Sequence, residues 1–120
     1  MEKKTLVLGA SENPARYSNM AVKKLHAYGH PVIAIGRRDG NINGITITKK
    51  AVEAKEVDTV TLYLNPYNQK PYYDYITALK PKRIIFNPGT ENPELERLAE
   101  ENGIKTLEAC TLVMLSTGQY

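Results

Sequence analysis

The chain has 120 residues, of which 42% are hydrophobic and 24% are charged, and its formal net charge is +3. This balance is typical of one globular domain with its own core, so we take residues 1–120 as a single domain. The small positive excess does not favour nucleic acid as a partner, and no apolar run approaches the roughly 18 residues of a membrane span. Because one cysteine, Cys110, cannot form an internal disulfide, we expect a reducing, cytoplasmic location.

The first predicted strand, Thr5–Leu8, breaks at Gly9 and leads into a loop. A helix is predicted from about Ser18 or Asn19 to Tyr28 by its helical spacing of apolar residues. A strand, a glycine-led loop and a helix start favour phosphate, since backbone N–H groups and the helix N-terminus point at the same place.

The dinucleotide fingerprint G-x-G-x-x-G is incomplete in this loop. Ser11 replaces its second glycine and Pro14 replaces its third. Taken alone, the corner therefore fits an ordinary strand–loop–helix turn as well as a nucleotide site.

The next predicted strand, Pro31–Ile35, is apolar throughout, as expected for a strand that is covered on both faces. Ile45–Ile47 alternates like a short edge strand, and Thr48 predicts the cap of a short helix over Lys49–Lys55. The other predicted elements are, in order, a strand at Thr59–Leu64, a helix containing Tyr72, Ile76 and Leu79, a strand at Arg83–Phe86, a helix that begins at Asn92-Pro93, a short strand at Lys105–Leu107 and an apolar tail at Cys110–Leu115.

This alternation of strands and helices predicts an α/β fold, a three-layer Rossmann-type sandwich with a mostly parallel sheet of about five strands. Ligands of such sheets bind beyond the carboxyl ends of the strands. The loops predicted to meet there carry donors and amides: Ser11, Asn13, Arg16, Arg37, Arg38, Asn65, Asn87 and Thr90. These groups suit an anion rather than turnover, so we predict no catalytic residue, and no spacing indicates a metal site.

Arg37 and Arg38 stand where NAD-binding domains usually carry an acid for the ribose diol. A guanidinium there suits a phosphorylated ribose, because its fork can bind phosphate with two hydrogen bonds. Asp39 follows directly, so a strand end shifted by a residue or two would restore an acid.

Other residues have alternative interpretations. Ser11 lacks the G-x-S-x-G surroundings of a nucleophile, and neither histidine is expected to face it. Cys110 fits an inert, small buried side chain better than a reactive thiol. Tyr67 is the tyrosine at a loop end where a nucleotide base could stack.

Four segments together resemble a known family: Gly9–Ser18, Tyr28–Val32, Asn87–Asn92 and Gly103–Cys110. Their order and spacing resemble the stand-alone CoA-binding domain family, which is similar to the CoA-binding domain of the α subunit of succinyl-CoA synthetase. The resemblance covers nearly the whole chain. Members often continue strand two into Asn-Pro, where this chain has Gly36-Arg37-Arg38, and often begin the loop after strand four with Gln, where it has Asn87.

The resemblance implies coenzyme A as the cofactor. The synthetase reaction needs a phosphorylated histidine and further domains, for which we expect no room in 120 residues, so we expect binding without chemistry. It places Gly9, Ala10, Ser11, Glu12 and Asn13 along the phosphates and pantetheine, and Arg37 or Arg38 at the 3′-phosphate. It also implies that the adenosine is edged by Leu64, Asn65 and Pro66, and the pantetheine arm by Asn87, Pro88 and Gly89.

The leading hypothesis is therefore a protein that binds coenzyme A or an acyl-CoA through the loop after the first strand. An NADP(H)-binding enzyme or redox sensor shares the fold and the arginines. A protein-interaction module without a ligand is the third alternative. We expect a small-molecule nucleotide as partner, neither nucleic acid nor membrane, and the sequence indicates no particular protein partner.

Overall fold

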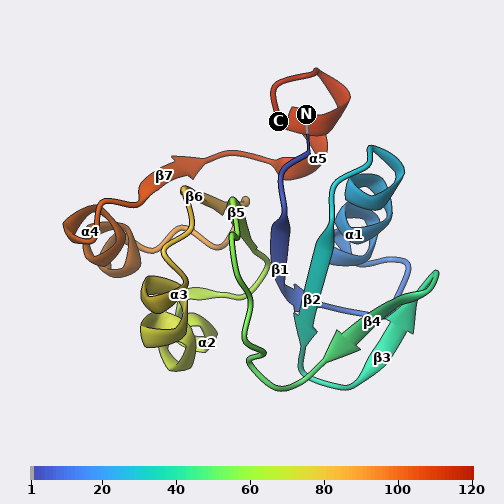
Figure 1. Cartoon of the computed structure of the whole chain (residues 1–120), viewed down its shortest axis with the longest axis horizontal. Coiled ribbons are helices and arrows are strands. Elements are labelled where there is room, and N and C mark those ends of the chain that lie inside the picture. The colour runs from blue at the N-terminus through green and yellow to red at the C-terminus, as the bar shows by residue number, and fades with distance from the viewer. Residues whose placement is uncertain (1) are drawn as a thin grey trace.

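A seven-stranded sheet in the order β3-β4-β2-β1-β5-β6-β7 forms the centre of the protein, with helices on both faces (Figure 1). The computed structural model describes residues 2–120. Its elements are β1 (Thr5–Ala10), α1 (Tyr17–Ala27), β2 (Val32–Gly36), β3 (Gly40–Ile42), β4 (Ile45–Thr48), β5 (Thr59–Leu62), α2 (Pro66–Gln69), the 3₁₀ helix η1 (Lys70–Tyr72), α3 (Tyr73–Leu79), β6 (Arg83–Phe86), α4 (Pro93–Glu101), β7 (Lys105–Glu108) and α5 (Thr111–Ser116).

All strand pairs are parallel except β3 with β4. The central strand β1 alternates its side chains between two hydrophobic clusters, as a strand covered on both faces does. Leu6 and Leu8 join the cluster that packs under α3 and α4, whereas Val7 joins the cluster under α1 and α5. Ala10 also joins the second cluster, because the register of β1 shifts between Leu8 and Ala10. The predicted three-layer Rossmann-type α/β sandwich is confirmed.

The ends of α1 and α4 follow from local sequence. Asn92 accepts hydrogen bonds from the main-chain N–H groups of Glu94 and Leu95, and Pro93 occupies the first helical position of α4, as predicted. Gly29 follows α1 with φ of 87°, a conformation that favours glycine and stops the helix.

The sheet has seven strands instead of about five. The edge strand predicted at Ile45–Ile47 is β4, whereas β3, which forms a hairpin with it, was not predicted. The helix predicted over Lys49–Lys55 is wrong, since this segment is irregular. Thr48 Oγ1 donates to the carbonyl of Lys50 instead of capping a helix. Val52 and Ala54 both pack against the core cluster, and a spacing of two residues suits an extended chain rather than a helical one.

Tyr120 folds back onto the amino ends of the strands, beside the start of β1 (Figure 1). Its hydroxyl is hydrogen-bonded to Thr5 Oγ1. The Arg83 guanidinium carbon lies 4.5 Å from the centre of its ring, and Arg83 also donates to its main-chain oxygen at 2.9 Å. His30 packs its ring 4.9 Å from the same ring. Polar groups at the amino ends of the strands are thus paired with one another.

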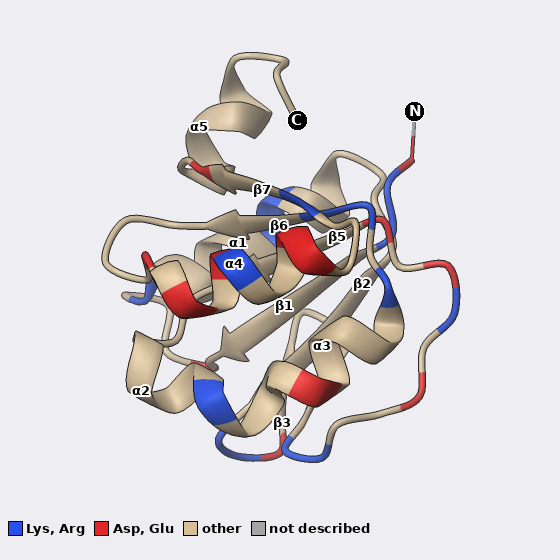
Figure 2. Cartoon of the chain, turned by 90° about the vertical axis from the view of Figure 1, so that its left-hand side faces the viewer, with Lys and Arg blue, Asp and Glu red and all other residues tan. Residues whose placement is uncertain are grey.

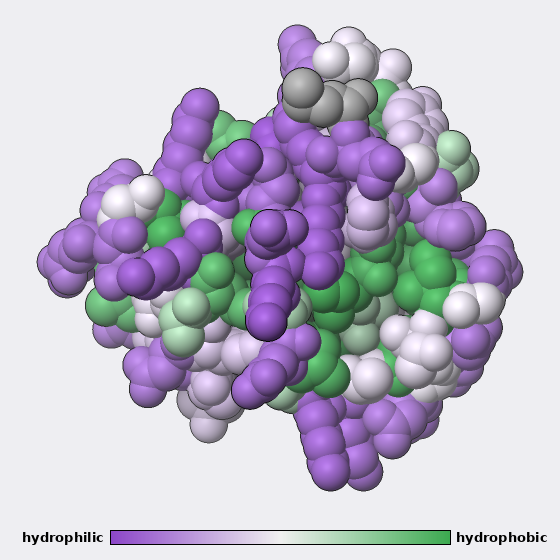
Figure 3. Space-filling model, viewed as in Figure 1, coloured by the Kyte–Doolittle hydropathy of each residue, from purple (hydrophilic) through white to green (hydrophobic). Residues whose placement is uncertain are grey.

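Charged residues of both signs are interspersed over the helices and loops (Figure 2). The surface seen in Figure 3 is mostly hydrophilic, with an apolar region near its centre that long hydrophilic side chains border. Within residues 2–120, no helix has the length and apolar character needed to cross a bilayer.

Candidate functional site

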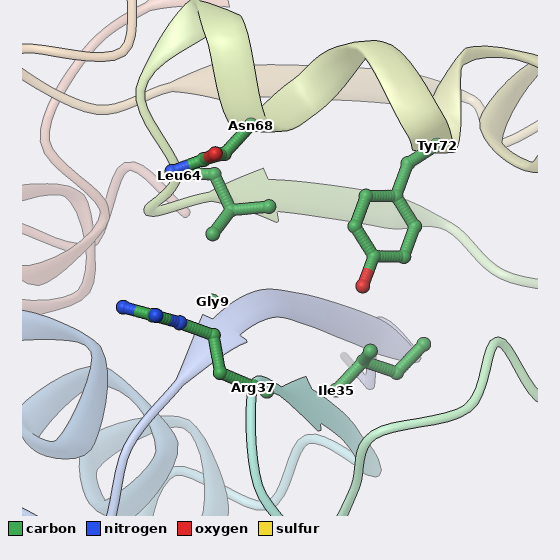
Figure 4. Close-up of a pocket in the computed structure, with 7 residues that line it drawn as sticks. Gly9, Ile35, Arg37, Leu64, Asn68 and Tyr72 are labelled. Atoms are coloured by element: carbon green, nitrogen blue, oxygen red, sulfur yellow. The ribbon is translucent and has the colours of Figure 1, made fainter.

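The carboxyl ends of β1, β2 and β5 meet at one cleft of about 260 Å³ (Figure 4). The chain leaves β1 for β2 on one side and reaches β5 on the other, which makes this the switch point where α/β sheets bind ligands. The cleft is lined by Gly9, Ile35, Gly36, Arg37, Leu64, Asn68 and Tyr72.

Two glycines give the cleft its shape. Gly36 lies so close to β1 that a Cβ atom there would be 2.2 Å from the carbonyl oxygen of Ala10. Gly9 has φ of +101°, and a Cβ atom there would meet the main-chain carbon of Tyr63 at 3.0 Å. A side chain at either position would strain the backbone or push apart the strands that frame the cleft.

The loop after β1 is held by its own hydrogen bonds. Asn13 Oδ1 accepts from the N–H of Ala15 at 3.0 Å, and the N–H of Asn13 donates to Ser11 Oγ at 3.1 Å. Asn19 Nδ2 reaches back from α1 to the carbonyl of Ser11. Ser11 is half-buried and Asn13 is exposed, so this loop presents a fixed and accessible backbone.

Glu12, which the sequence placed on the ligand path, turns toward the edge hairpin. Its Oε2 accepts from the N–H of Asn41 at 3.0 Å, and its side chain fills the space beside Gly40. Its carboxylate therefore joins the loop to β3.

The N-terminus of α1 opens beside this loop. Arg16 occupies the N-cap position, and in the described part of the chain no side chain caps this end of the helix. Free N–H groups of a first helical turn attract anions. The exposed Arg16 adds a positive charge at the same place.

The arginines after β2 lie where the sequence predicted them. The strand ends at Gly36, Arg37 lines the cleft, and Arg38 is exposed next to it. Within residues 2–120, neither guanidinium forms a salt bridge with a carboxylate. Asp39 Oδ1 accepts from the N–H of Lys49 at 3.0 Å, so the neighbouring acid is engaged with the chain beyond β4.

The wall opposite β2 comes from a helix that the sequence analysis treated as a loop. Asn65 Oδ1 accepts from the N–H of Asn68 and caps α2, with Pro66 at the first helical position. This is the same Asn-Pro signal that begins α4, and it could have predicted α2. Leu64, just before the cap, points into the cleft (Figure 4).

α2 brings Asn68 to the cleft and η1 brings Tyr72, and neither residue was predicted in the site. Tyr72 instead of Tyr67 is the tyrosine that lines the cleft. Tyr67 is 80% exposed and is not among the lining residues. The helical spacing that marked Tyr72 as a core residue holds too, since it packs against the core cluster.

The loop after β6 lies outside the cleft lining, and its residues divide into structural and accessible ones. Asn87 is buried: its Nδ2 donates to Thr61 Oγ1 and to the carbonyl of Leu62, and its Oδ1 accepts from the N–H of Thr111. Its carboxamide holds β5, β6 and α5 together. Pro88 and Gly89 are exposed.

Tyr63 and Cys110 lie near each other on the face of the sheet opposite the cleft. Burial is the main cause that raises the pKa of the Tyr63 hydroxyl well above its usual value of 10.0. Cys110 is half-buried at the N-cap of α5.

Ser11 and His30 lie at opposite ends of the sheet, as expected, because His30 packs against Tyr120. In the part that the structure describes, no three His, Cys, Asp or Glu side chains gather as a metal site would require.

A cleft at the switch point of a parallel sheet, bordered by exposed arginines and by the N-terminus of α1, is the arrangement by which Rossmann-type domains bind nucleotides. The chain matches the CoA binding domain family over residues 3–116 and belongs to that family. A comparison with curated protein sequences gave no match.

Solved structures share the fold. One, described as a crystal structure of an uncharacterized protein, is 52% identical, with a TM-score of 0.97 over 100% of this chain and 99% of its own. The Thermus thermophilus protein ID.343 is 22% identical, with a TM-score of 0.85 over 98% of this chain and 90% of its own. A dinucleotide-forming acetyl-coenzyme A synthetase from Candidatus Korarchaeum cryptofilum is 20% identical, with a TM-score of 0.70 over 88% of this chain but 25% of its own.

Proposed function

We propose that this protein binds coenzyme A or an acyl-CoA in the cleft and along the loop after β1, without catalysing a reaction on it. The observation that carries the proposal is the Arg37 guanidinium, which lines a cleft between β2 and α2 and has no carboxylate partner among residues 2–120. An arginine in that position has hydrogen-bond donors available for the 3′-phosphate of coenzyme A.

The rest of the ligand has matching surfaces. The diphosphate would meet the main chain of Gly9 to Asn13 and the N-terminus of α1, where Arg16 adds a cation. Leu64, Asn65 and Pro66 would edge the adenosine. The pantetheine arm would run over Pro88 and Gly89, since the Asn87 side chain is occupied by internal hydrogen bonds.

The absence of catalysis is part of the proposal. The side chains at the cleft are an arginine, an amide, a tyrosine and aliphatic groups, which bind and orient but do not form a nucleophile–base pair. Membership of the CoA binding domain family supports the ligand. The single cysteine supports a reducing compartment, and we include the cytoplasm in the proposal.

The test is isothermal titration calorimetry of coenzyme A and 3′-dephospho-CoA against the wild-type protein and the Arg37→Ala/Arg38→Ala variant. Loss of a charge-assisted phosphate contact should weaken coenzyme A by about 1.5–3 kcal/mol, or about 10- to 150-fold. The dephospho ligand should bind both proteins alike. Arg97→Ala, an exposed arginine on α4, is the matched control.

Two outcomes would contradict the proposal. If the double variant lost the same affinity for both ligands, Arg37 and Arg38 would not bind the 3′-phosphate. A wild-type protein that ignores coenzyme A and is stabilised by NADPH would instead support the NADP(H) alternative, which the same two arginines also fit through a 2′-phosphate.

A further inference from the structure

We propose that Asn68 reads the amino edge of an adenine base that packs beside Tyr72 in the cleft. This inference rests on the proposed function and adds to it the residue that selects the base. It makes the protein specific for adenine nucleotides, independently of the arginines that bind the phosphate.

The cleft has an apolar part and a polar part. Figure 4 shows the Tyr72 ring extending from η1 toward β2 with its hydroxyl directed toward Ile35, and Leu64 lies on the same wall between Tyr72 and Asn68. Arg37 and Asn68 lie at the other end of the cleft, on its two facing walls. A purine has apolar faces and a polar edge, so its faces match the first part and its edge matches the second.

Asn68 has an available carboxamide. Its main-chain N–H is used in the α2 cap, where it donates to Asn65 Oδ1 at 2.9 Å. Its side chain is exposed and forms no hydrogen bond with any other residue in the 2–120 range. The nearby Asn65 carboxamide is already engaged as the cap, which leaves Asn68 as the amide in the lining that can reach a ligand.

A carboxamide is complementary to adenine. On its N7 edge, adenine presents the N6 amino donor next to the N7 acceptor, and an asparagine side chain offers an acceptor oxygen and a donor nitrogen at matching separation. Hypoxanthine replaces the amino group with a carbonyl oxygen. On the edge that carries N7, the carboxamide oxygen would then face a second acceptor, and one of the two hydrogen bonds would be lost.

Tyr72 supplies the flat surface that a base needs and a flexible pantetheine arm does not. It is half-buried and packed against the core cluster, so its ring is held in place before a ligand arrives. Arg37 lies at the same end of the cleft as Asn68 but on the facing wall, which places the phosphate-binding cation across from the edge of the base, as in a nucleotide whose ribose spans the two.

The experiment is a calorimetric titration of adenosine 3′,5′-bisphosphate and inosine 3′,5′-bisphosphate. These probes differ at the base edge and omit the pantetheine arm. Wild-type protein should prefer the adenosine ligand by about 5- to 150-fold, the range of one good bidentate contact to a base. Asn68→Ala should lower this preference to within about twofold of unity, because the adenosine ligand loses two hydrogen bonds and the inosine ligand only the one that it retains.

Two further variants isolate the roles. Asn102→Ala removes an exposed asparagine at the end of α4 and should leave the preference intact. Tyr72→Leu, which keeps the site apolar, should weaken both bisphosphates by about 5- to 100-fold, as loss of a stacking surface does, without changing their ratio. Melting temperatures show whether each variant is folded.

The results separate this inference from the function on which it rests. Wild-type protein that binds coenzyme A but does not distinguish the two bisphosphates would overturn the inference alone. Persistence of the preference in Asn68→Ala would do the same. Wild-type protein that binds neither bisphosphate nor coenzyme A would overturn the proposed function as well.

Discussion

The two ends of the sheet use the same kinds of side chain in opposite ways. At the amino end, Arg83 stacks on Tyr120 and lies 4.0 Å from the carboxylate of Asp58. At the carboxyl end, Arg37 and Arg38 are exposed, and within residues 2–120 neither is paired with a carboxylate. The arginine at the amino end holds parts of the chain together, whereas the arginines at the carboxyl end are available to a ligand.

Stability and ligand binding are expected to depend on opposite ends of the sheet. A paired and partly buried arginine contributes through packing and hydrogen bonds, while an exposed, unpaired one contributes little to folding. Changes at the amino end should therefore alter stability with little effect on ligand affinity. Changes at the exposed arginines should do the reverse.

The largest stability effect is expected from Tyr120→Ala at the amino end. The change removes a ring packed against Arg83 and His30 and the hydrogen bond to Thr5, and should lower the free energy of unfolding by about 2–4 kcal/mol. Urea denaturation measures the loss. Tyr67→Ala, which removes an 80% exposed ring, is the control and should change stability by about 0.5 kcal/mol or less.

The Tyr120 variant also tests the independence of the two ends. Coenzyme A affinity, measured where the variant is fully folded, should stay within about twofold of wild type. A large drop in affinity would show that the two ends of the sheet are coupled.

A smaller effect is expected where the cleft itself is built. Gly36→Ala places a Cβ atom 2.2 Å from the backbone oxygen of Ala10, so β1 and β2 must move apart. We expect a loss of about 1–3 kcal/mol in the free energy of unfolding, together with weaker coenzyme A binding.

Gly40→Ala is the matched control for that change. Its Cβ atom would lie 2.5 Å from the carboxyl carbon of Glu12, which is the far end of a flexible side chain and can turn away. Chemical denaturation of both variants should show the larger loss for Gly36→Ala. Equal losses would mean that the close approach of β2 to β1 does not set the cost of a side chain at Gly36.

The smallest effect is a pH dependence at the amino end. Burial lowers the pKa of His30 below 6.5, and nearby cations, among them Lys3 and Arg83, lower it further. The unfolded chain therefore takes up a proton at this histidine more readily than the folded one. Its contribution to stability is present above pH 6.5 and is lost as the pH falls toward the folded pKa.

The melting temperature should accordingly fall slightly as the pH is lowered through 6.5. His30→Gln should flatten this dependence, since it removes the titrating ring. An unchanged slope in the variant would assign the pH dependence to other groups.

The sequence predicted the sheet better than its edges. Buried parallel strands such as β1 and β6 are short, mostly apolar runs, and such runs fit few other secondary structures. The edge strand β3 has three residues, and pairing with β4 rather than its own pattern decides its structure. The segment after β4 carries a capping threonine and charged residues that favour a helix, but the packing of Val52 and Ala54 against the core prevailed.

The site was predicted unevenly for a related reason. Residues adjacent to a strand end, such as Gly9 and Arg37, are fixed by the strand and were placed from sequence. Asn68 and Tyr72 reach the cleft only because α2 and η1 fold back over it, which depends on the Asn65 cap. The side chain of Asn87 has the right position along the chain, but its three hydrogen bonds commit it to the interior.

The hydrogen bond from Asn41 to Glu12 has a consequence for the timing of binding. It fixes the loop after β1 to the edge hairpin, and Asn13 and Asn19 fix the rest of that loop from within. A ligand that arrives at such a loop does not have to wait for it to order, so the encounter resembles the docking of two rigid bodies. Differences in affinity among ligands of this site should then arise mainly from how slowly each one leaves.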